Sequence, residues 1–451
     1  MNNGNRSDAI HPKGTYDYAL GQRTYSSLRL LEKPPSAWFN LLIVLLLVVP
    51  IYGTFYPFET YLMAGGEEGA GLRGGIPYTP VMLVLISIAS IFLYFRIRRD
   101  QRVTHEFLAY LFVAIAFVSC GWSGMLMPSF QRALRLLPAV ALGVLIAQSY
   151  NLQRTLRLMT VAFLISALAC ILMVVLYPGL GLSKLGNGYE NAWRGAMVQK
   201  NFTGFTFALG MVVTCYAWFL RSISKALALV TLTLCTFVMV MSDSATSILA
   251  LIGTLAAVLW MNFLQRMPFR LRPIFIVVTL LAVTASVMMS GPIMDTFVVA
   301  TGRDMTLTGR TVIWSAVWAQ IESSPFLGHG YGIWSSENPV RTMMWQAIGD
   351  VAAHSHNSWL DIWLQLGLFG LIALILVVVV ASGRALWLLM MTNIPETQFF
   401  LAIIILLMIR SVSEVEFTDP SIKGLFWLVW AATNLKILVK NVQANDASQK
   451  Y

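Results

Sequence analysis

Residues 358–381, SWLDIWLQLGLFGLIALILVVVVA, decide the fold class of this chain. Asp361 is the sole ionisable side chain in a run that is otherwise mostly apolar. A helix needs about 20 such residues to cross the roughly 30 Å hydrocarbon core of a bilayer. The run is therefore long enough and apolar enough to form a membrane-spanning helix.

The composition of the whole chain agrees with this run. Of its 451 residues, 57% are hydrophobic and 12% are charged. Soluble domains carry about 25% charged residues, so an ordinary water-soluble enzyme is excluded. The net charge of +10 would suit nucleic-acid binding, but the basic residues follow the loops between apolar runs instead. We therefore expect a membrane protein whose partners include the lipid bilayer and exclude nucleic acid.

Further apolar runs near the spanning length recur along the chain. They lie at about 37–55, 79–96, 105–122, 134–149, 158–177, 201–220, 225–242, 245–264, 273–290, 358–381, 397–413 and 423–439. The pattern predicts an all-α polytopic membrane protein with about twelve transmembrane helices.

The distribution of basic residues predicts the orientation of these helices. If residues 1–36 are cytoplasmic, the loops on that side hold about twice as many Lys and Arg residues as the opposite loops. We therefore expect cytoplasmic tails at 1–36 and 440–451, spans one to nine within 37–290, a long outer loop at 291–357, and spans ten to twelve within 358–439.

The outer loop at 291–357 is longer than a connection requires, and loops of this length tend to be functional. Apolar residues recur in it at helical spacing, at Val312, Ile313, Val317 and Ile321. Thr308 is a candidate cap for this helix and Pro325 a candidate stop. A second short helix is expected around 339–352. Both read as amphipathic helices lying at the membrane interface.

Three polar residues lie at the outer mouth of the sixth predicted span, namely Arg194, Lys200 and Asn201. Arginine offers a bidentate fork and lysine a point charge, a combination that can hold a phosphate or diphosphate. In the alternative interpretation, both cations anchor the helix end by reaching the lipid head groups. The positive-inside bias argues mildly against this alternative.

The long outer loop adds two more cations, Arg303 and Arg310, and a Gly-rich stretch from Pro325 to Gly332. A turn of that composition either lets the backbone approach a ligand or reverses the chain. Arg310 begins the predicted loop helix, where the helix N-terminus already favours anions. An interfacial anchor is an equally good interpretation of Arg310.

The string His354-Ser355-His356-Asn357 stands at the entry to the tenth predicted span. A histidine there can take a proton from a hydroxyl near neutral pH or orient an acceptor. The alternative is a polar cap of the following helix. We interpret Gly367 and Gly370, within that span, as sites of close helix packing.

Other polar groups near the spans allow further readings. Arg410 and Glu414, at i and i+4, are expected to form a structural ion pair on one helix face. Asp361 either orients the histidine one turn earlier or caps its own helix. A metal site built from His354 and His356 with His329 or Asp350 is conceivable, but a lone His-x-His is a weak pattern and we expect no metal.

One spacing resembles a pattern of the O-antigen ligase family: His356-Asn357, followed by nine residues and then by Gly367 and Gly370. Two further strings resemble the wider superfamily of lipid-linked polysaccharide ligases and polymerases: Gly309 to Trp314 with Pro325 to Gly332, and Trp193-Arg194-Gly195 with Lys200-Asn201. The last string is most similar to the exopolysaccharide-polymerase branch. The resemblance covers about residues 120–420.

The resemblance implies a membrane glycosyltransferase of the GT-C type that needs no cofactor or metal. Such an enzyme transfers a glycan from undecaprenyl diphosphate to an acceptor sugar hydroxyl at the periplasmic face of the bacterial inner membrane, so the outer loop is periplasmic. Its catalytic residues are expected to be His356 and Arg310. Its substrate-binding residues are expected to be Arg194, Lys200, Asn201, Arg303 and Asn357.

Within this superfamily we favour a polymerase of surface or exopolysaccharide repeat units. The alternative is a ligase that moves finished glycan to lipid A core or another acceptor. A third reading is a lipid-linked glycan flippase, but the polar candidates crowd one membrane face instead of lining a central path. The implied partners are the lipid-linked donor and the glycan or lipid-core acceptor, with a flippase and chain-length regulators as further candidates.

Overall fold

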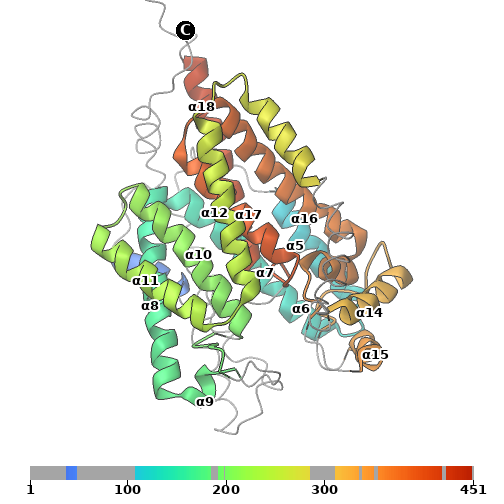
Figure 1. Ribbon diagram of the computed structural model, residues 1–451. Coiled ribbons are helices and arrows are strands. Elements are labelled where there is room, and N and C mark those ends of the chain that lie inside the picture. Colours follow the sequence, from blue (N-terminus) through green and yellow to red (C-terminus); the bar gives the residue numbers. More distant parts are fainter. Residues whose placement is uncertain are drawn as a thin grey trace, which may run out of the picture.

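The computed structural model describes residues 37–47, 107–183, 191–197, 199–284, 310–334, 338–349, 354–418 and 423–448. These residues form a bundle of helices (Figure 1). Within the described ranges, extended pairing is limited to an isolated bridge between Leu182 and Trp193. The predicted all-α class is confirmed.

The helices of the described residues follow one another in chain order. They are α2 (Ala37–Leu46), α5 (Phe107–Ser119), the 3-10 turn η4 (Cys120–Trp122), α6 (Leu126–Leu134), α7 (Leu136–Ser149), α8 (Leu152–Leu176), α9 (Pro178–Gly181), α10 (Lys200–Phe219), α11 (Lys225–Met241), α12 (Ala245–Gln265), α14 (Arg310–Ser323), α15 (Pro339–Ile348), α16 (Ser358–Met391), α17 (Pro395–Ser411) and α18 (Lys423–Ser448). A further helix runs from Arg272 to Thr284.

Side-chain caps fix several helix starts. Asn151 accepts from the backbone N–H of Arg154 at the start of α8, and Ser224 accepts from Leu227 at the start of α11. Such caps satisfy donors that have no partner within the helix. Proline occupies the first position of α15 and α17, where its missing N–H costs nothing.

Five helical stretches are long and apolar enough to cross a membrane: Leu126–Ser149, Leu152–Leu176, Lys200–Phe219, Ala245–Gln265 and Ser358–Met391. Shorter apolar helices lie at Phe107–Trp122, Lys225–Met241 and Arg272–Thr284. A polytopic membrane protein is therefore supported, while the number twelve stays a prediction. The second predicted span, 79–96, lies outside the described residues, as does part of the first.

The centre of the bundle is built around α18, which packs against α7, α16 and α17. Trp427 and Trp430 of α18 are fully buried, with ring centroids 5.5 Å apart. Trp430 also contacts Phe400 of α17, centroid to centroid, at 5.4 Å. Gly143 allows the backbones of α7 and α18 to meet, since a Cβ there would lie 3.1 Å from the carbonyl oxygen of Phe426. Aromatic packing and close backbone approach thus hold the core.

Helix α16 is broken at Gly367, which has φ 64° and ψ −167°. The Gly-rich turn predicted from Pro325 fits into this break, and the N–H of Leu368 donates to the carbonyl of Pro325 at 2.9 Å. A Cβ on Gly367 would collide with the carbonyl of Phe326. The prediction that Gly367 serves helix packing is therefore wrong, because its left-handed backbone and missing Cβ admit a loop.

The two helices predicted in the long loop are confirmed as α14 and α15, which lie side by side near α16 (Figure 1). In α14, Val317 and Ile321 are buried against Leu364 of α16 and Met344 of α15. Trp318 remains exposed. The apolar face of α14 is thus covered by protein, and its second half is fixed on the first turns of α16. The predicted cap Thr308 lies outside the described residues.

Candidate functional site

Five chain segments meet at one end of the bundle. They are the starts of α10, α12, α14 and α16, and the turn that follows α17. In the predicted topology, the start of α14 lies in the long outer loop and the other four lie at span ends on that same side of the membrane. The residues gathered there come from positions more than 200 apart in the chain, such as Asn201 and Glu414.

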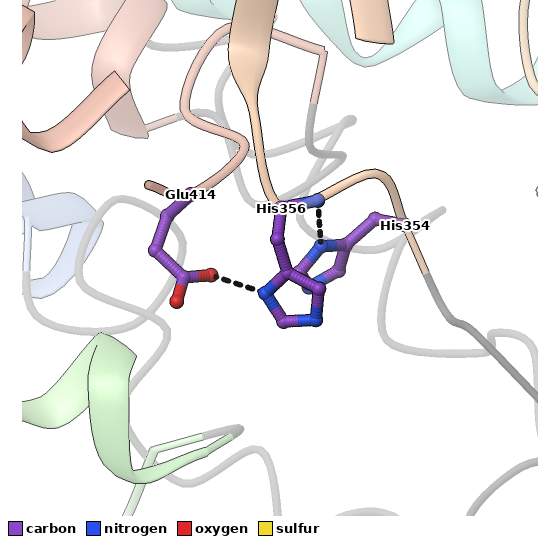
Figure 2. Close-up of side chains that lie close together, drawn as sticks. All are labelled: His354, His356 and Glu414. Atoms are coloured by element: carbon purple, nitrogen blue, oxygen red, sulfur yellow. Dashed lines mark hydrogen bonds and ion pairs between the residues drawn. The ribbon is translucent and has the colours of Figure 1, made fainter. Parts of the chain in front are cut away.

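Glu414 is the centre of this arrangement and is only 2% exposed. Its Oε1 accepts from Asn201 Nδ2 at 2.8 Å and from Arg310 Nη2 at 2.8 Å. Its Oε2 lies 3.3 Å from Nδ1 of His356. Figure 2 shows the His356 ring directed at this carboxylate from the segment of chain that leads into α16. Three residues predicted for the site therefore converge on one carboxylate.

The backbone around Glu414 is held by the first residue of α16. Ser358 Oγ donates to the carbonyl of Glu414 at 2.8 Å and accepts from the N–H of Glu416 at 2.9 Å. The N–H of Glu414 donates to the carbonyl of Arg410 at 3.0 Å. The carboxylate and the histidine are thus supported by the same helix start, which fixes their relative position.

His356 has a left-handed backbone, with φ 52°. Such a conformation is unusual for a residue other than glycine and tends to occur at functional sites. Its N–H donates to Nδ1 of His354 at 3.2 Å, and the two rings lie 4.1 Å apart between centroids. Asn357 caps α16 by accepting from the N–H groups of Trp359 and Leu360. The turn therefore projects the imidazole of His356 away from the helix axis toward Glu414.

The electrostatic setting keeps Glu414 ionised. Burial alone would raise the pKa of Glu414, but the charge of Arg410 and the pairing with His356 hold this pKa well below its usual range. For His354, burial and then the neighbouring His356 lower the pKa to about 3. His354 is therefore neutral at physiological pH, in the form that accepts the N–H of His356.

The expected ion pair between Arg410 and Glu414 is wrong. Arg410 Nε instead donates to Glu416 Oε1 at 2.9 Å, and its Nη2 donates to the carbonyl of Asn201 at 3.0 Å. Helix α17 ends at Ser411, so residue 414 does not lie one turn further along a helix face. Arg410 therefore fixes the start of α10, and its charge acts on Glu414 without an ion pair between the two side chains.

The remaining candidates have different neighbours. Lys200 Nζ donates to the carbonyl of Asp243 at 2.9 Å. Arg194 Nε donates to the carbonyl of Leu180 at 2.6 Å, and burial lowers the pKa of Arg194. Asn357 Nδ2 donates to the carbonyl of Val412 at 3.2 Å. Arg303 lies outside the described residues. Substrate contacts by these four residues stay predictions.

Asp361 does not contact the histidine rings. It accepts hydrogen bonds from Trp334, Gln365, Ser355 and Thr418. These donors come from the long loop, from α16 and from the turn after α17. Asp361 therefore ties together the chain segments behind the site, and the orienting partner of His356 is Glu414.

Comparison with known proteins bears directly on this region. Residues 227–375 match the family model described as O-antigen ligase, and this range contains α14, the first part of α16, Arg310 and His356. The match confirms the predicted resemblance. The chain is also 28% identical, over 356 residues, to the exopolysaccharide production protein ExoQ of Rhizobium meliloti (strain 1021). This alignment covers 75% of the chain and 79% of ExoQ. Together these similarities support a membrane polysaccharide polymerase or ligase.

Sequence reasoning missed Glu414 as the hub of the site. The residue lies beyond the range matched to the O-antigen ligase family, and it was assigned to a local ion pair. One signal was available, because an ionisable group at the outer end of a span is expected to be functional. Its actual partners are Asn201, Arg310 and His356, which lie far away in sequence.

The site also contains a possible set of metal ligands. Donor atoms of His354, His356 and Glu414 lie within 4.8 Å of one another. Of the other ligands considered from the sequence, His329 has its Nε2 2.8 Å from the carbonyl of Gln320, and Asp350 lies outside the described residues. Arg310 already occupies Oε1 of the shared carboxylate. A guanidinium on the same carboxylate opposes a second cation and suits an anionic ligand better.

Proposed function

We propose that this chain is a glycosyltransferase that polymerises surface or exopolysaccharide repeat units from undecaprenyl-diphosphate-linked donors at the periplasmic face of the bacterial inner membrane. The observation that carries the proposal is the convergence of Arg310 and His356 on the buried carboxylate of Glu414. A cation and a base side by side are what displacement of a diphosphate by a hydroxyl requires.

The reaction is a single displacement at the anomeric carbon of the donor sugar. The acceptor hydroxyl oxygen forms a new bond to this carbon, and the bond from the carbon to the diphosphate oxygen breaks. The hydroxyl proton passes to His356, and the electron pair of the broken bond leaves with the diphosphate. One displacement inverts the anomeric configuration, so the product linkage has the opposite configuration to the donor.

Glu414 defines which nitrogen of His356 acts as the base. A carboxylate 3.3 Å from Nδ1 favours the tautomer with a proton on that nitrogen. The other ring nitrogen, Nε2, then carries the lone pair that accepts the acceptor's proton. The imidazolium formed in the reaction is stabilised by the same carboxylate, as in other histidine and carboxylate pairs.

Arg310 is the candidate group for the diphosphate. It is 8% exposed, and while its Nη2 donates to Glu414, its Nη1 is buried without a hydrogen-bond partner in the described structure. Buried donors normally have partners, and one without a partner at a site of this kind suggests a ligand. An oxygen of the departing diphosphate would satisfy it.

The similarity to ExoQ, named for exopolysaccharide production, favours a polymerase. The match to the O-antigen ligase family favours the second candidate, a ligase that transfers finished glycan. Both use the same displacement and the same donor class, and they differ in the acceptor.

Deletion of the gene followed by complementation tests the proposal. Wild type, His356→Ala, Arg310→Ala and the control His329→Gln are expressed at matched level, and lipid-linked and surface glycans are sized on a gel. We expect both site variants to leave only single repeat units on the carrier, while the control makes polymer. Long chains that stay on the carrier would establish a ligase instead, and repeat units retained on the cytoplasmic side would indicate a flippase. Normal polymer from either site variant would remove that residue from the mechanism.

A further inference from the structure

A second arginine in the long loop is buried, and none of the residues that the structure describes forms an ion pair with it. Arg341, near the start of α15, is 8% exposed, and its Nε has no hydrogen-bond partner in the described structure. Its guanidinium carbon lies 3.8 Å from the centre of the Trp345 ring. A cation–π contact replaces only part of the hydration that a buried guanidinium loses. The side chain therefore has unused capacity to bind an anion.

The surroundings of Arg341 add positive charge and another partnerless donor. Burial and then the neighbouring Arg132 of α6 lower the pKa of Arg341 to about 10. Gly332 lies against both Arg132 and Ser129, since a Cβ there would be 3.0 Å from Arg132 Cδ and 3.5 Å from Ser129 Oγ. Ser129 Oγ is itself buried without a hydrogen-bond partner in the described structure. Arg132 and Ser129 thus lie together against Gly332, where α6 and the long loop meet, and the charge of Arg132 acts on Arg341.

Hydrogen bonds of Asn338 fix the start of α15 in position. Asn338 caps α15 through the N–H of Val340, and its Nδ2 donates to the carbonyl of Ser123 at 2.9 Å. The start of α15 is thereby fixed to the connection between α5 and α6. The N-terminal end of the α15 helix dipole adds to the field that Arg341 and Arg132 create.

Buried arginines elsewhere in the chain show what a structural role looks like. Arg272 is 1% exposed and donates to the carbonyls of Gln265, Met267, Leu389 and Thr392 and to Oδ1 of Asn393. Arg410 is equally well bonded. Arg341 is also buried, at 8% exposed, but no comparable set of acceptors surrounds it among the residues that the structure describes. A role in ligand binding accounts for this difference.

We propose that Arg341 and Arg132, with Ser129, bind the diphosphate of a second lipid-linked glycan, the acceptor. This inference rests on the proposed polymerase function, because the acceptor of a polymerase is itself attached to a lipid diphosphate. Arg310 binds the donor diphosphate and cannot bind the acceptor diphosphate at the same time. The two sites are joined by α14, which begins at Arg310 and packs against α15 through Val317 and Ile321. At 1.5 Å per residue, these two contact positions lie roughly 10–17 Å along α14 from Arg310.

Binding stoichiometry tests the proposal. Purified full-length protein in phosphatidylcholine nanodiscs is titrated with undecaprenyl diphosphate, and bound molecules per chain are counted by native mass spectrometry. We expect two for wild type, one for Arg341→Gln, one for Arg310→Gln and none for the double variant. Arg272→Gln is the control and should still bind two wherever the protein is folded.

The outcomes separate the two claims. A count of one for both wild type and Arg341→Gln would overturn the second site and leave the donor site intact. Loss of one molecule in Arg341→Gln with no loss in Arg310→Gln would overturn the proposed function at Arg310. Displacement of the second molecule by phosphatidylglycerol at similar concentration would identify a site for bilayer head groups and overturn the acceptor assignment. If Arg341→Gln does not fold, Arg132→Gln carries the same expectation.

Discussion

Replacing Glu414 by glutamine is the most informative change in this protein. The two side chains have nearly the same shape, so the variant removes one charge and little volume. Glutamine leaves the buried Arg310 without its counter-charge and takes away the carboxylate that His356 faces at 3.3 Å. Both proposed functional groups are therefore perturbed by a single substitution.

The structure sets the size of the expected effect. Breaking a buried ion pair by removing one partner costs about 3–5 kcal/mol, because the remaining charge stays buried and unpaired. Glutamine still offers an oxygen to Asn201 or Arg310, so we expect a value near the low end, about 3 kcal/mol. A histidine base that loses its orienting carboxylate loses on the order of 10²–10⁴-fold in rate.

The assay compares rate and stability in the same preparations. Polymer formation is measured per folded molecule, and thermal unfolding is followed in detergent for Glu414→Gln, Arg310→Gln and the double variant. The double variant should be less destabilised than the sum of the two single ones, since it contains neither half of the pair.

Glu416 supplies a matched control. It is also buried, and its carboxylate pairs with Arg410 at 2.9 Å, away from His356. Glu416→Gln should lower stability to a similar extent and leave the rate per folded molecule within about tenfold of wild type. Equal rate losses in Glu414→Gln and Glu416→Gln, or a wild-type rate in Glu414→Gln, would refute the role assigned to Glu414.

Three further expectations follow from single residues. Gly367→Ala should lower the free energy of unfolding by about 2–4 kcal/mol, because of the positive φ and the collision with Phe326. Gly383→Ala in the same helix, where nothing lies within 4 Å of the added Cβ, should be neutral or stabilising. Equal effects of the two substitutions in thermal unfolding would refute the explanation of the helix break. Folding lowers the pKa of His354 from 6.5 to about 3, so the unfolded state binds one more proton than the folded state between these pH values. Stability should therefore be unaffected by this group above pH 6.5 and fall by about 1.4 kcal/mol per pH unit as pH falls from 6.5 towards 3. His354→Asn should flatten this dependence, and an unchanged slope would contradict it. Chelators should leave transfer activity in purified membranes intact, and a loss that zinc or magnesium restores would assign the His354, His356 and Glu414 cluster to a metal.

Local patterns in the sequence predicted local structure well. The spacing of Val317 and Ile321 predicted α14, and both residues are buried on the face that the spacing implies. A polar cap was the alternative interpretation of the string from His354 to Asn357, and Asn357 does cap α16. Helix periodicity and capping depend on neighbours within one or two turns, which a single sequence contains.

Patterns that require knowledge of where a helix ends were less reliable. The pairing of Arg410 with Glu414 assumes a continuous helix, but α17 stops at Ser411 and the chain turns back toward Ser358. Gly367 likewise lies inside an apolar run that has no proline, and the break becomes visible only when the turn at Phe326 is present to fill it. In both cases a contact distant in sequence decides the local backbone.

The residues of the site balance the charges that develop in the proposed reaction, and no local sequence pattern predicts this arrangement. During the proposed transfer, positive charge develops on His356 as it takes the proton, and negative charge develops on the departing diphosphate. Glu414 faces the first of these charges and Arg310 the second, and the two residues are already joined at 2.8 Å. The positive charge on His356 and the negative charge on the diphosphate are therefore both compensated by one buried ion pair, Arg310 with Glu414, which need not reorganise during the reaction. Because this pair spans residues 310 and 414, the chemistry depends on the packing of α14 against the turn after α17 as much as on either side chain.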